Sequence, residues 1–153
     1  MWSSRNKQEF TQEQFAYFIE DQIADFREPT GAKMLETALN FRVKQGIHFK
    51  SGMRLQDGTV QFEYSEQNEG AVGTQGKLSI PELFRIDIPV WEGLGQKKYQ
   101  FEARFRWKLS GGNLALRYEL IRPHKVIEQA FKDVLDGITA KLKDVPVIFG
   151  KPE

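Results

Sequence analysis

Residues Tyr99–Ile121 read YQFEARFRWKLSGGNLALRYELI, and they alternate apolar and polar side chains almost without error. A period of two is the side-chain period of a half-buried β-strand. The segment Ser110–Asn113 between the two runs contains two adjacent glycines, which favour a tight turn. The stretch therefore predicts a long antiparallel hairpin whose aromatic side chains face the core, while its arginines and lysines are displayed on the other face.

The turn fixes which residues of the hairpin lie opposite each other. A two-residue turn at the glycines places Arg106 opposite Arg117 and Arg104 opposite Glu119. Like charges directly opposite each other are unfavourable. The arginine pair therefore needs either a nearby acid, for which Glu102 and Glu119 are close enough, or an anionic ligand.

Composition excludes several classes of protein. The chain has 153 residues, 40% of them hydrophobic, which fits one globular domain spanning residues 1–153. It has no cysteine and two histidines, so it has no disulfide or thiolate metal site, and we expect no metal site and no cofactor. No apolar run is long enough to span a membrane, and residues 1–7 lack the apolar core of a signal peptide.

The charge is small overall but unevenly distributed. The formal net charge is +1, which argues against a strongly electrostatic nucleic-acid binder. Residues 41–122 nevertheless carry thirteen basic and nine acidic groups, whereas residues 1–40 carry four basic and seven acidic groups. The predicted sheet is therefore the basic part of the chain.

Helix signals flank the predicted sheet on both sides. Thr11 and Gln14 have the spacing of a capping box, and Thr30 precedes a second helical stripe. Pro123 begins a third helix with a broad apolar stripe that needs a sheet to lie on. The pattern predicts helices over residues 11–27, 31–40 and 123–142 and an apolar tail at residues 145–149.

The sheet is predicted to cover residues 41–121 as an antiparallel meander of about five strands. Asp57-Gly58 is a strong hairpin signal, and a two-residue turn there places Arg54 opposite Gln61 and Lys50 opposite Ser65. Strand and helix signals together predict an α+β fold with the N-terminal and C-terminal helices packed on one face of the sheet.

The displayed sheet face is the first candidate binding site. Its basic residues would form a platform for nucleic acid or for an acidic protein; they are Arg42, Lys44, Lys50, Arg54, Arg104, Arg106, Lys108 and Arg117. The simpler interpretation, which carries more weight, is a solvated outer face of mixed charge. The interleaved aromatic residues point to the core, so they cannot stack on bases.

The start of the C-terminal helix is the second candidate site. Arg122, His124 and Lys125 surround the free amides of the first turn, which suit an anion, and His124 could act as an acid or base. A proline helix start with solvated basic neighbours is the commoner arrangement. No nucleophile-elbow, phosphate-loop or dinucleotide motif is present, so the sequence gives catalysis no positive support.

Five motifs spread over Phe10–Leu142 resemble the YfdQ-like family of phage and prophage proteins. In order they are FAYFIED at 15–21, SGMRLQDG at 51–58, LSIPE at 78–82, IPVWEG at 88–93 and YELIRPHK at 118–125. The resemblance implies a phage-encoded protein that acts in the cytoplasm of the bacterial host. It supplies no site residues, because the function of that family is unknown. It also implies a longer protein, with this chain matching the C-terminal part and an N-terminal half that could hold the activity.

These observations favour a non-enzymatic accessory protein that binds a macromolecule, nucleic acid or a host protein, through the basic sheet face. One alternative is an inhibitor of a host defence system that acts by protein binding. Another is a small anionic ligand site or an enzymatic site at Arg122–Lys125. In a structural or assembly role, the apolar tail would dock on a neighbouring subunit and form a homo-oligomer.

Overall fold

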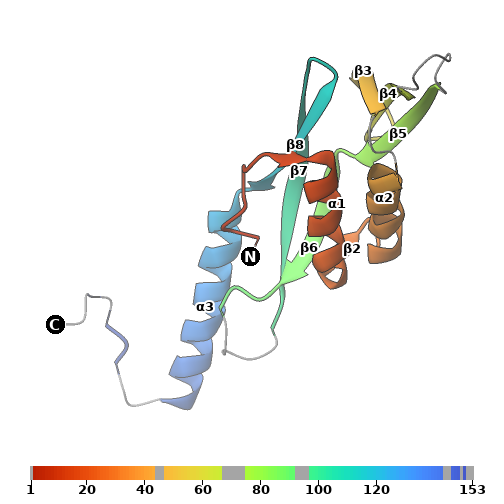
Figure 1. Cartoon of the computed structure of the whole chain (residues 1–153). Coiled ribbons are helices and arrows are strands. Elements are labelled where there is room, and N and C mark those ends of the chain that lie inside the picture. Colours follow the sequence, from red (N-terminus) through yellow and green to blue (C-terminus); the bar gives the residue numbers. More distant parts are fainter. Residues whose placement is uncertain are drawn as a thin grey trace.

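The structure is a computed structural model that describes residues 2–43, 47–66, 75–91, 97–142, 146–148 and 150, without the side chains of 41–43, 47, 48, 66 and 75. The described residues form antiparallel β-sheets and α-helices, which confirms the α+β class (Figure 1). The elements are β1 Phe10–Thr11, α1 Gln12–Asp21, the 3₁₀ helix η1 Ile23–Asp25, β2 Phe26–Glu28, α2 Gly31–Val43, β3 Ile47–Arg54, β4 Thr59–Glu66, β5 Gln75–Pro81, β6 Leu83–Ile88, β7 Tyr99–Ser110, β8 Asn113–Ile121 and α3 Pro123–Lys141.

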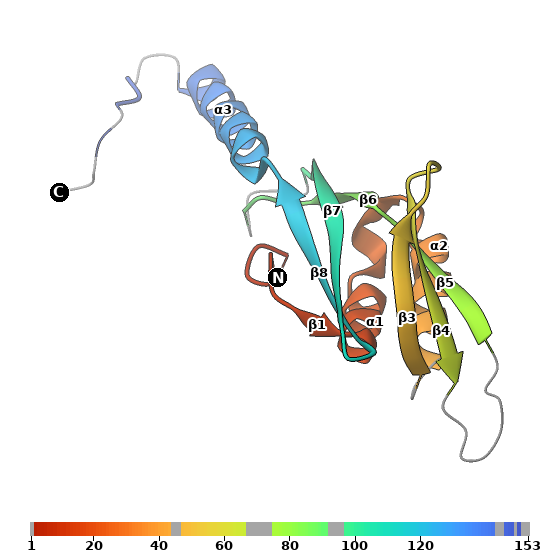
Figure 2. The same ribbon diagram turned by 90° about the horizontal axis from the view of Figure 1, so that it is seen from above.

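The strands form two sheets where the sequence predicts one. One sheet has the order β1-β8-β7-β6-β2, and the other has the order β3-β4-β5. Both contain a meander of consecutive strands, and the chain passes from one sheet to the other at Glu82, between β5 and β6. Helices α1 and α2 lie on the same side of the sheets, whereas α3 projects from the end of the larger sheet (Figure 2).

The β7–β8 hairpin has the predicted register. Arg106 lies opposite Arg117, Arg104 lies opposite Glu119, and Ser110 and Asn113 close the turn. The apolar side chains of both strands are buried in alternation, as the period of two predicts; they include Phe101, Ala103, Phe105, Leu114, Leu116 and Tyr118. The outer face of the hairpin is consequently left to the charged residues.

The predicted first helix is too long. The capping box of Thr11 and Gln14 is present, but α1 ends at Asp21, and β2 then pairs with β6. Phe26 is the cause, since its ring packs against Trp2 and Phe84 and carries the chain into the sheet instead of another helical turn. Tertiary contacts override a local helical stripe here.

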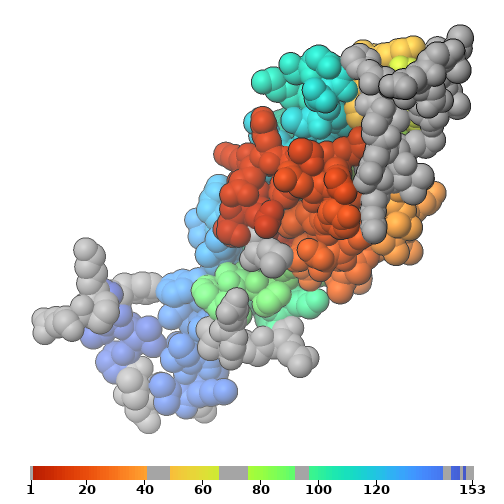
Figure 3. Space-filling view, viewed as in Figure 1, coloured from red at the N-terminus to blue at the C-terminus, as the bar shows by residue number. Residues whose placement is uncertain are grey.

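Trp2 is a core residue that sequence reasoning did not single out. It is 3% exposed, its ring packs edge-on against Phe18 and Tyr118, and its carbonyl accepts a hydrogen bond from the Tyr118 hydroxyl at 2.6 Å. This contact joins residues that are 116 positions apart. The N-terminal segment and α1 accordingly cover the middle of the face shown in Figure 3.

The second predicted helix is too short, because α2 continues to Val43 and the predicted strand from Phe41 is wrong. The predicted register of the next hairpin is also wrong, since Arg54 lies opposite Val60 and Ser65 lies opposite His48. The turn begins earlier than a two-residue turn would: the amide of Leu55 donates to the carbonyl of Thr59. A bulge between Phe49 and Ser51 then shifts the register again.

The two sheets share one hydrophobic core. Trp107 of β7 packs edge-on against Phe62 of β4, with ring centroids 5.2 Å apart. The amide of Phe49 donates to the carbonyl of Gly112 at the tip of the β7–β8 turn. The β7–β8 hairpin therefore contacts the smaller sheet through both a side chain and its turn.

Candidate binding face on strands β7 and β8

The outer face of β7 and β8 lies opposite α1. Arg104, Arg106 and Lys108 follow one another along this face of β7, and Arg117 stands beside Arg106 on β8. In Figure 2 the two strands run in front of α1, with no helix drawn over them. We call these four side chains, together with Glu102 and Glu119, the β7–β8 outer face.

Glu119 resolves the conflict between the two opposed arginines. Its Oε2 is 3.1 Å from Arg106 Nε and its Oε1 is 3.2 Å from Arg117 Nη2, so one carboxylate bridges both cations. The hydrogen bond from Arg106 is the main reason why the pKa of Glu119 lies below its ordinary value of 4.5. Glu119 is therefore the acid that this register requires, and the pair of arginines needs no bound anion.

Arg104 and Lys108 are the cations of this face for which the described residues show no hydrogen bond or ion pair. Arg104 is half-buried, and its Nε is enclosed with no partner among the described residues. Lys108 is exposed. A buried donor without a partner loses its hydration without compensation, so the enclosed Arg104 Nε destabilises the folded state.

Charges of both signs continue across β6 and β2. Arg85 Nη1 is 2.6 Å from Glu28 Oε2, and Arg27 Nε is 3.8 Å from Asp87 Oδ2. The larger sheet thus carries an array of paired charges, with its basic excess confined to β7 and β8. This distribution is closer to the mixed outer face than to a uniform basic platform.

The other predicted platform residues are not part of β7 or β8. Arg42 belongs to α2, Lys44 is outside the described residues, and Lys50 is exposed at the bulge of β3. Arg54 is also on β3, where its Nε is 3.3 Å from Glu82 Oε1. Those of the eight predicted residues that the structure describes therefore come from α2, from β3 of the smaller sheet and from β7 and β8 of the larger sheet, and not from one continuous sheet.

The helix start at Arg122–Lys125 is ordinary in its contacts. Pro123 occupies the first turn, as predicted, and the Lys125 ammonium is 3.0 Å from Glu128 on the same helix. Arg122 has a left-handed backbone with φ 47°, and His124 is exposed.

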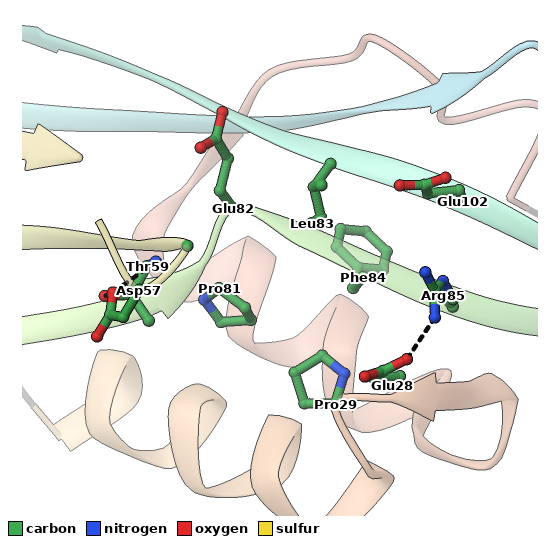
Figure 4. A pocket seen from close by; sticks show the side chains of 11 residues that line it. Glu28, Pro29, Asp57, Thr59, Pro81, Glu82, Leu83, Phe84, Arg85 and Glu102 are labelled. Carbon is green, nitrogen blue, oxygen red and sulfur yellow. Dashed lines mark hydrogen bonds and ion pairs between the residues drawn. The ribbon is translucent and has the colours of Figure 1, made fainter. Parts of the chain in front are cut away.

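Sequence reasoning missed a pocket at the junction of the two sheets (Figure 4). It has a volume of about 320 Å³, and its lining includes four carboxylates: Glu28, Asp57, Glu82 and Glu102. Glu28 and Glu82 are bound by arginines, and Asp57 accepts from the Thr59 hydroxyl at 2.7 Å, which lowers its pKa. These residues are far apart in sequence, so no local signal could have assembled them.

Residue Glu82, which lines this pocket, connects the strands that meet there. Around Glu82, the backbone amide donates to Gly58 and the carbonyl accepts from Phe105, so this residue links three strands and a turn. Among the described residues, no group of three or more metal-ligating side chains could hold a metal ion. Nor does any described helix combine the length and apolar character needed to cross a membrane.

Nearly the whole chain matches the model of one protein family. A family described as an uncharacterized conserved protein, DUF2303, has a model that matches residues 1–152. The chain belongs to the DUF2303 family. No curated protein and no solved structure matches it. Membership of DUF2303 fits the expectation of a family without an assigned function, and it leaves the interpretation of the site to the geometry.

Proposed function

We propose that this DUF2303 chain is a non-enzymatic accessory protein that binds an acidic protein surface through the β7–β8 outer face. The observation that carries the proposal is the row Arg104, Arg106 and Lys108, flanked by Arg117, on a sheet face opposite the helices. Four cations meet two carboxylates there, so the face keeps a local positive excess although the chain carries only +1.

A protein partner is favoured over nucleic acid by the carboxylates within the row. Glu119 sits between two arginines and Glu102 lies beside Arg104, so a phosphate backbone would meet fixed negative charges along the same strands. The described aromatic rings of the hairpin pack inward, so stacking on bases has no support. A protein surface with its own mixed charges can complement such an array.

The resemblance to phage and prophage proteins supplies the biological setting of the proposal. The chain would then be phage-encoded and would act in the cytoplasm of the bacterial host. A host protein, such as a component of a defence system, is the partner that this setting favours. The proposal needs no cofactor.

Defined polyanions test the proposal without a known partner. We expect fluorescence anisotropy to show salt-dependent binding of the full chain to a glutamate-rich glutamate–lysine copolymer, which carries mixed charges as a protein surface does, and about tenfold weaker binding by the Arg104→Gln/Lys108→Ala variant. A matched control is Lys33→Ala/Lys125→Ala, which removes two cations from helices. Tighter binding to a DNA duplex or single strand would indicate that the partner is nucleic acid and not a protein. If the chain bound none of these polyanions at low salt, the β7–β8 outer face would be excluded as a binding site.

A further inference from the structure

A groove of about 430 Å³ lies between helix α2 and strand β5 of the smaller sheet. On the β5 side it is lined by the consecutive residues 77–81, so side chains from both faces of the strand border it, and the groove follows the edge of the strand. On the helix side it is lined by four polar residues at helical spacing; they are Lys33, Glu36, Thr37 and Asn40. We call this space the α2–β5 groove.

The edge of β5 that borders the groove pairs with no described strand. β5 is the last strand in the order β3-β4-β5, and both ribbon views place α2 beside it (Figures 1 and 2). The amide of Glu82 donates to the carbonyl of Gly58 at 2.8 Å, one position past the last pair of the β4–β5 register. Backbone groups alternate in direction along a strand, so the residues of β5 in phase with Glu82 direct their amides at β4. Lys77 and Ser79 are out of phase with it, and their amides and carbonyls therefore point outward.

The outward backbone groups of β5 select an extended chain as the occupant of the groove. The amides of Lys77 and Ser79 donate to no acceptor within the part of the chain that the structure describes. Donors and acceptors that repeat about every 7 Å along an edge are matched by the backbone of another strand. The other edge of the same sheet differs, because the amide of Phe49 on β3 donates to Gly112 of the long hairpin. The edge of β5 is thus the one at which the sheet can be extended.

The side chains around the groove favour β-branched residues in the added strand. On the side of the sheet that faces α2, such a strand would lie next to the buried Leu78 and Ile80 and beneath the polar flank of the helix. Thr37 on this flank is buried, with its hydroxyl donating to the carbonyl of Lys33 at 3.1 Å, and Asn40 is exposed. A threonine in the added strand suits both surroundings, since its methyl group contacts apolar side chains and its hydroxyl bonds a polar one.

Gly76 extends the groove toward the interior of the smaller sheet. Tyr64 of β4 lies opposite Gly76 and lines the groove, although β5 stands between β4 and the open edge. A Cβ at Gly76 would collide with the Tyr64 hydroxyl, so the absence of a side chain there is what lets the tyrosine lie across β5. The aromatic ring consequently offers an apolar contact to one end of an added strand.

A second copy of the chain does not fit this edge. Antiparallel pairing of β5 with β5 of the partner subunit requires a two-fold axis perpendicular to the joined sheet, which puts both α2 helices on the same side. Within the smaller sheet α2 packs against β5, so the two helix axes would lie about one strand spacing apart, or about 5 Å. Packed helices need about 8–10 Å between their axes. A single extended segment, which brings no helix with it, avoids this clash.

We propose that the α2–β5 groove binds an extended segment of a partner protein, which adds to β5 as a further strand and carries β-branched residues on the side that faces α2. Backbone hydrogen bonds to Lys77 and Ser79 supply affinity, and the side chains beneath α2 supply specificity. The groove is separate from the β7–β8 outer face, so either proposal can fail without the other.

Hydrogen exchange of the full chain tests whether the edge of β5 is open. Followed by NMR, the amides of Lys77 and Ser79 should exchange at least about a hundredfold faster than those of Leu78 and Ile80, at every protein concentration. Slow exchange of Lys77 and Ser79 would show that another segment of the chain already covers the edge. Exchange that slows as the protein concentration rises would indicate that a second copy occupies it. Either result would overturn the proposal.

A display library of random peptides, selected on the immobilised full chain, tests the binding itself. The selected peptides should bind Ser79→Pro about tenfold more weakly than Ser79→Ala, because proline removes the outward amide and keeps the pairing with β4. Asn40→Trp, which fills the groove from the helix side, should have the same effect, whereas the adjacent Leu39→Trp, which does not line the groove, should not. If no peptide is enriched, or if Ser79→Pro binds the selected peptides as well as Ser79→Ala does, the proposal is wrong.

Discussion

At the scale of single residues, Glu119 determines whether the β7–β8 hairpin tolerates its opposed arginines. Glu119→Gln keeps the size of the side chain but leaves Arg106 and Arg117 facing each other without an acid. We expect a loss of about 1 kcal/mol in the free energy of unfolding at pH 7, measured by urea titration. Glu63→Gln is the matched control, because Glu63 is also on a strand and pairs with a single cation, Lys77, at 3.8 Å.

The pH dependence of the Glu119 effect follows from its lowered pKa. A carboxyl whose pKa is lower in the folded state stabilises the protein above its unfolded pKa, and this stabilisation is lost as the pH falls through the folded pKa. The difference between wild type and Glu119→Gln should therefore be full above pH 4.5 and should vanish at more acidic pH. A difference that persists unchanged in acid would show that the ion pairs are not its cause.

Arg122 carries backbone strain that a glycine would relieve. Its φ of 47° lies in the left-handed region, which costs a residue with a Cβ about 1 kcal/mol or more. Arg122→Gly should therefore be more stable than Arg122→Ala by about 1 kcal/mol in thermal unfolding, since both variants lack the guanidinium. If alanine proved equal or better, the left-handed conformation at this junction would be contradicted.

At the scale of elements, a polar cluster around Asp133 helps to attach α3 to Lys97 and β7. The Lys97 ammonium, with smaller contributions from Gln129 and Tyr99, lowers the pKa of Asp133 to about 2. The stabilisation by Asp133 is present above pH 3.8 and is lost as the pH falls toward 2. We expect Asp133→Asn to flatten the pH dependence of stability in this window, measured by thermal unfolding followed by circular dichroism.

Lys97→Met provides the control for this attachment. Without the ammonium, the Asp133 carboxyl should regain a more ordinary pKa, so the pH dependence between 4 and 2 should flatten in the same way. The double variant should add little to either single change, because the two side chains act as a pair. Additive effects would indicate that the two residues stabilise the protein independently.

The predictability of each element depended on whether its signal was local. The register of β7–β8 and the capping box of α1 came directly from neighbouring residues, and both are confirmed. β2 was missed because Phe26 continues the helical stripe of α1 and joins the sheet only through Trp2 and Phe84. The bulge near Lys50 is equally non-local, since it follows from packing of β3 against the tip of the long hairpin.

The same difference between local and non-local signals applies to the candidate sites. The local acid for Arg106 and Arg117 was predictable, because cross-strand neighbours follow from the register of one hairpin. The place of Arg42 in α2 and of Arg54 in a second sheet was not predictable, because it required knowing that the helix continues past Phe41 and that the chain forms two sheets. The apolar stripe of α3 was predictable from the spacing of its residues. The exposure of several of them was not, because it depends on the direction of the helix after Arg122.

At the scale of the whole molecule, Gly52 decides whether the two sheets can share a core. A Cβ at this position would lie 2.8 Å from Trp107 Cη2 and 2.9 Å from Phe62 Cδ1, which is closer than carbon atoms pack. Gly52→Ala should therefore cost about 1–3 kcal/mol in stability. Gly137→Ala is the contrasting control, since its Cβ meets open space in a helix interior and should stabilise the fold by up to about 1 kcal/mol.

The same variant tests the prediction of a single domain over residues 1–153. If the sheets unfold as one unit, hydrogen exchange of Gly52→Ala should show equal loss of protection in the slowest amides of β4 and β7, and a single thermal transition. Loss confined to β3–β5, with β7 and β8 keeping their wild-type protection, would divide the chain into two units. The Phe62–Trp107 contact and the hydrogen bond between Phe49 and Gly112 favour the first result, because both tie the smaller sheet to the hairpin that organises the larger one.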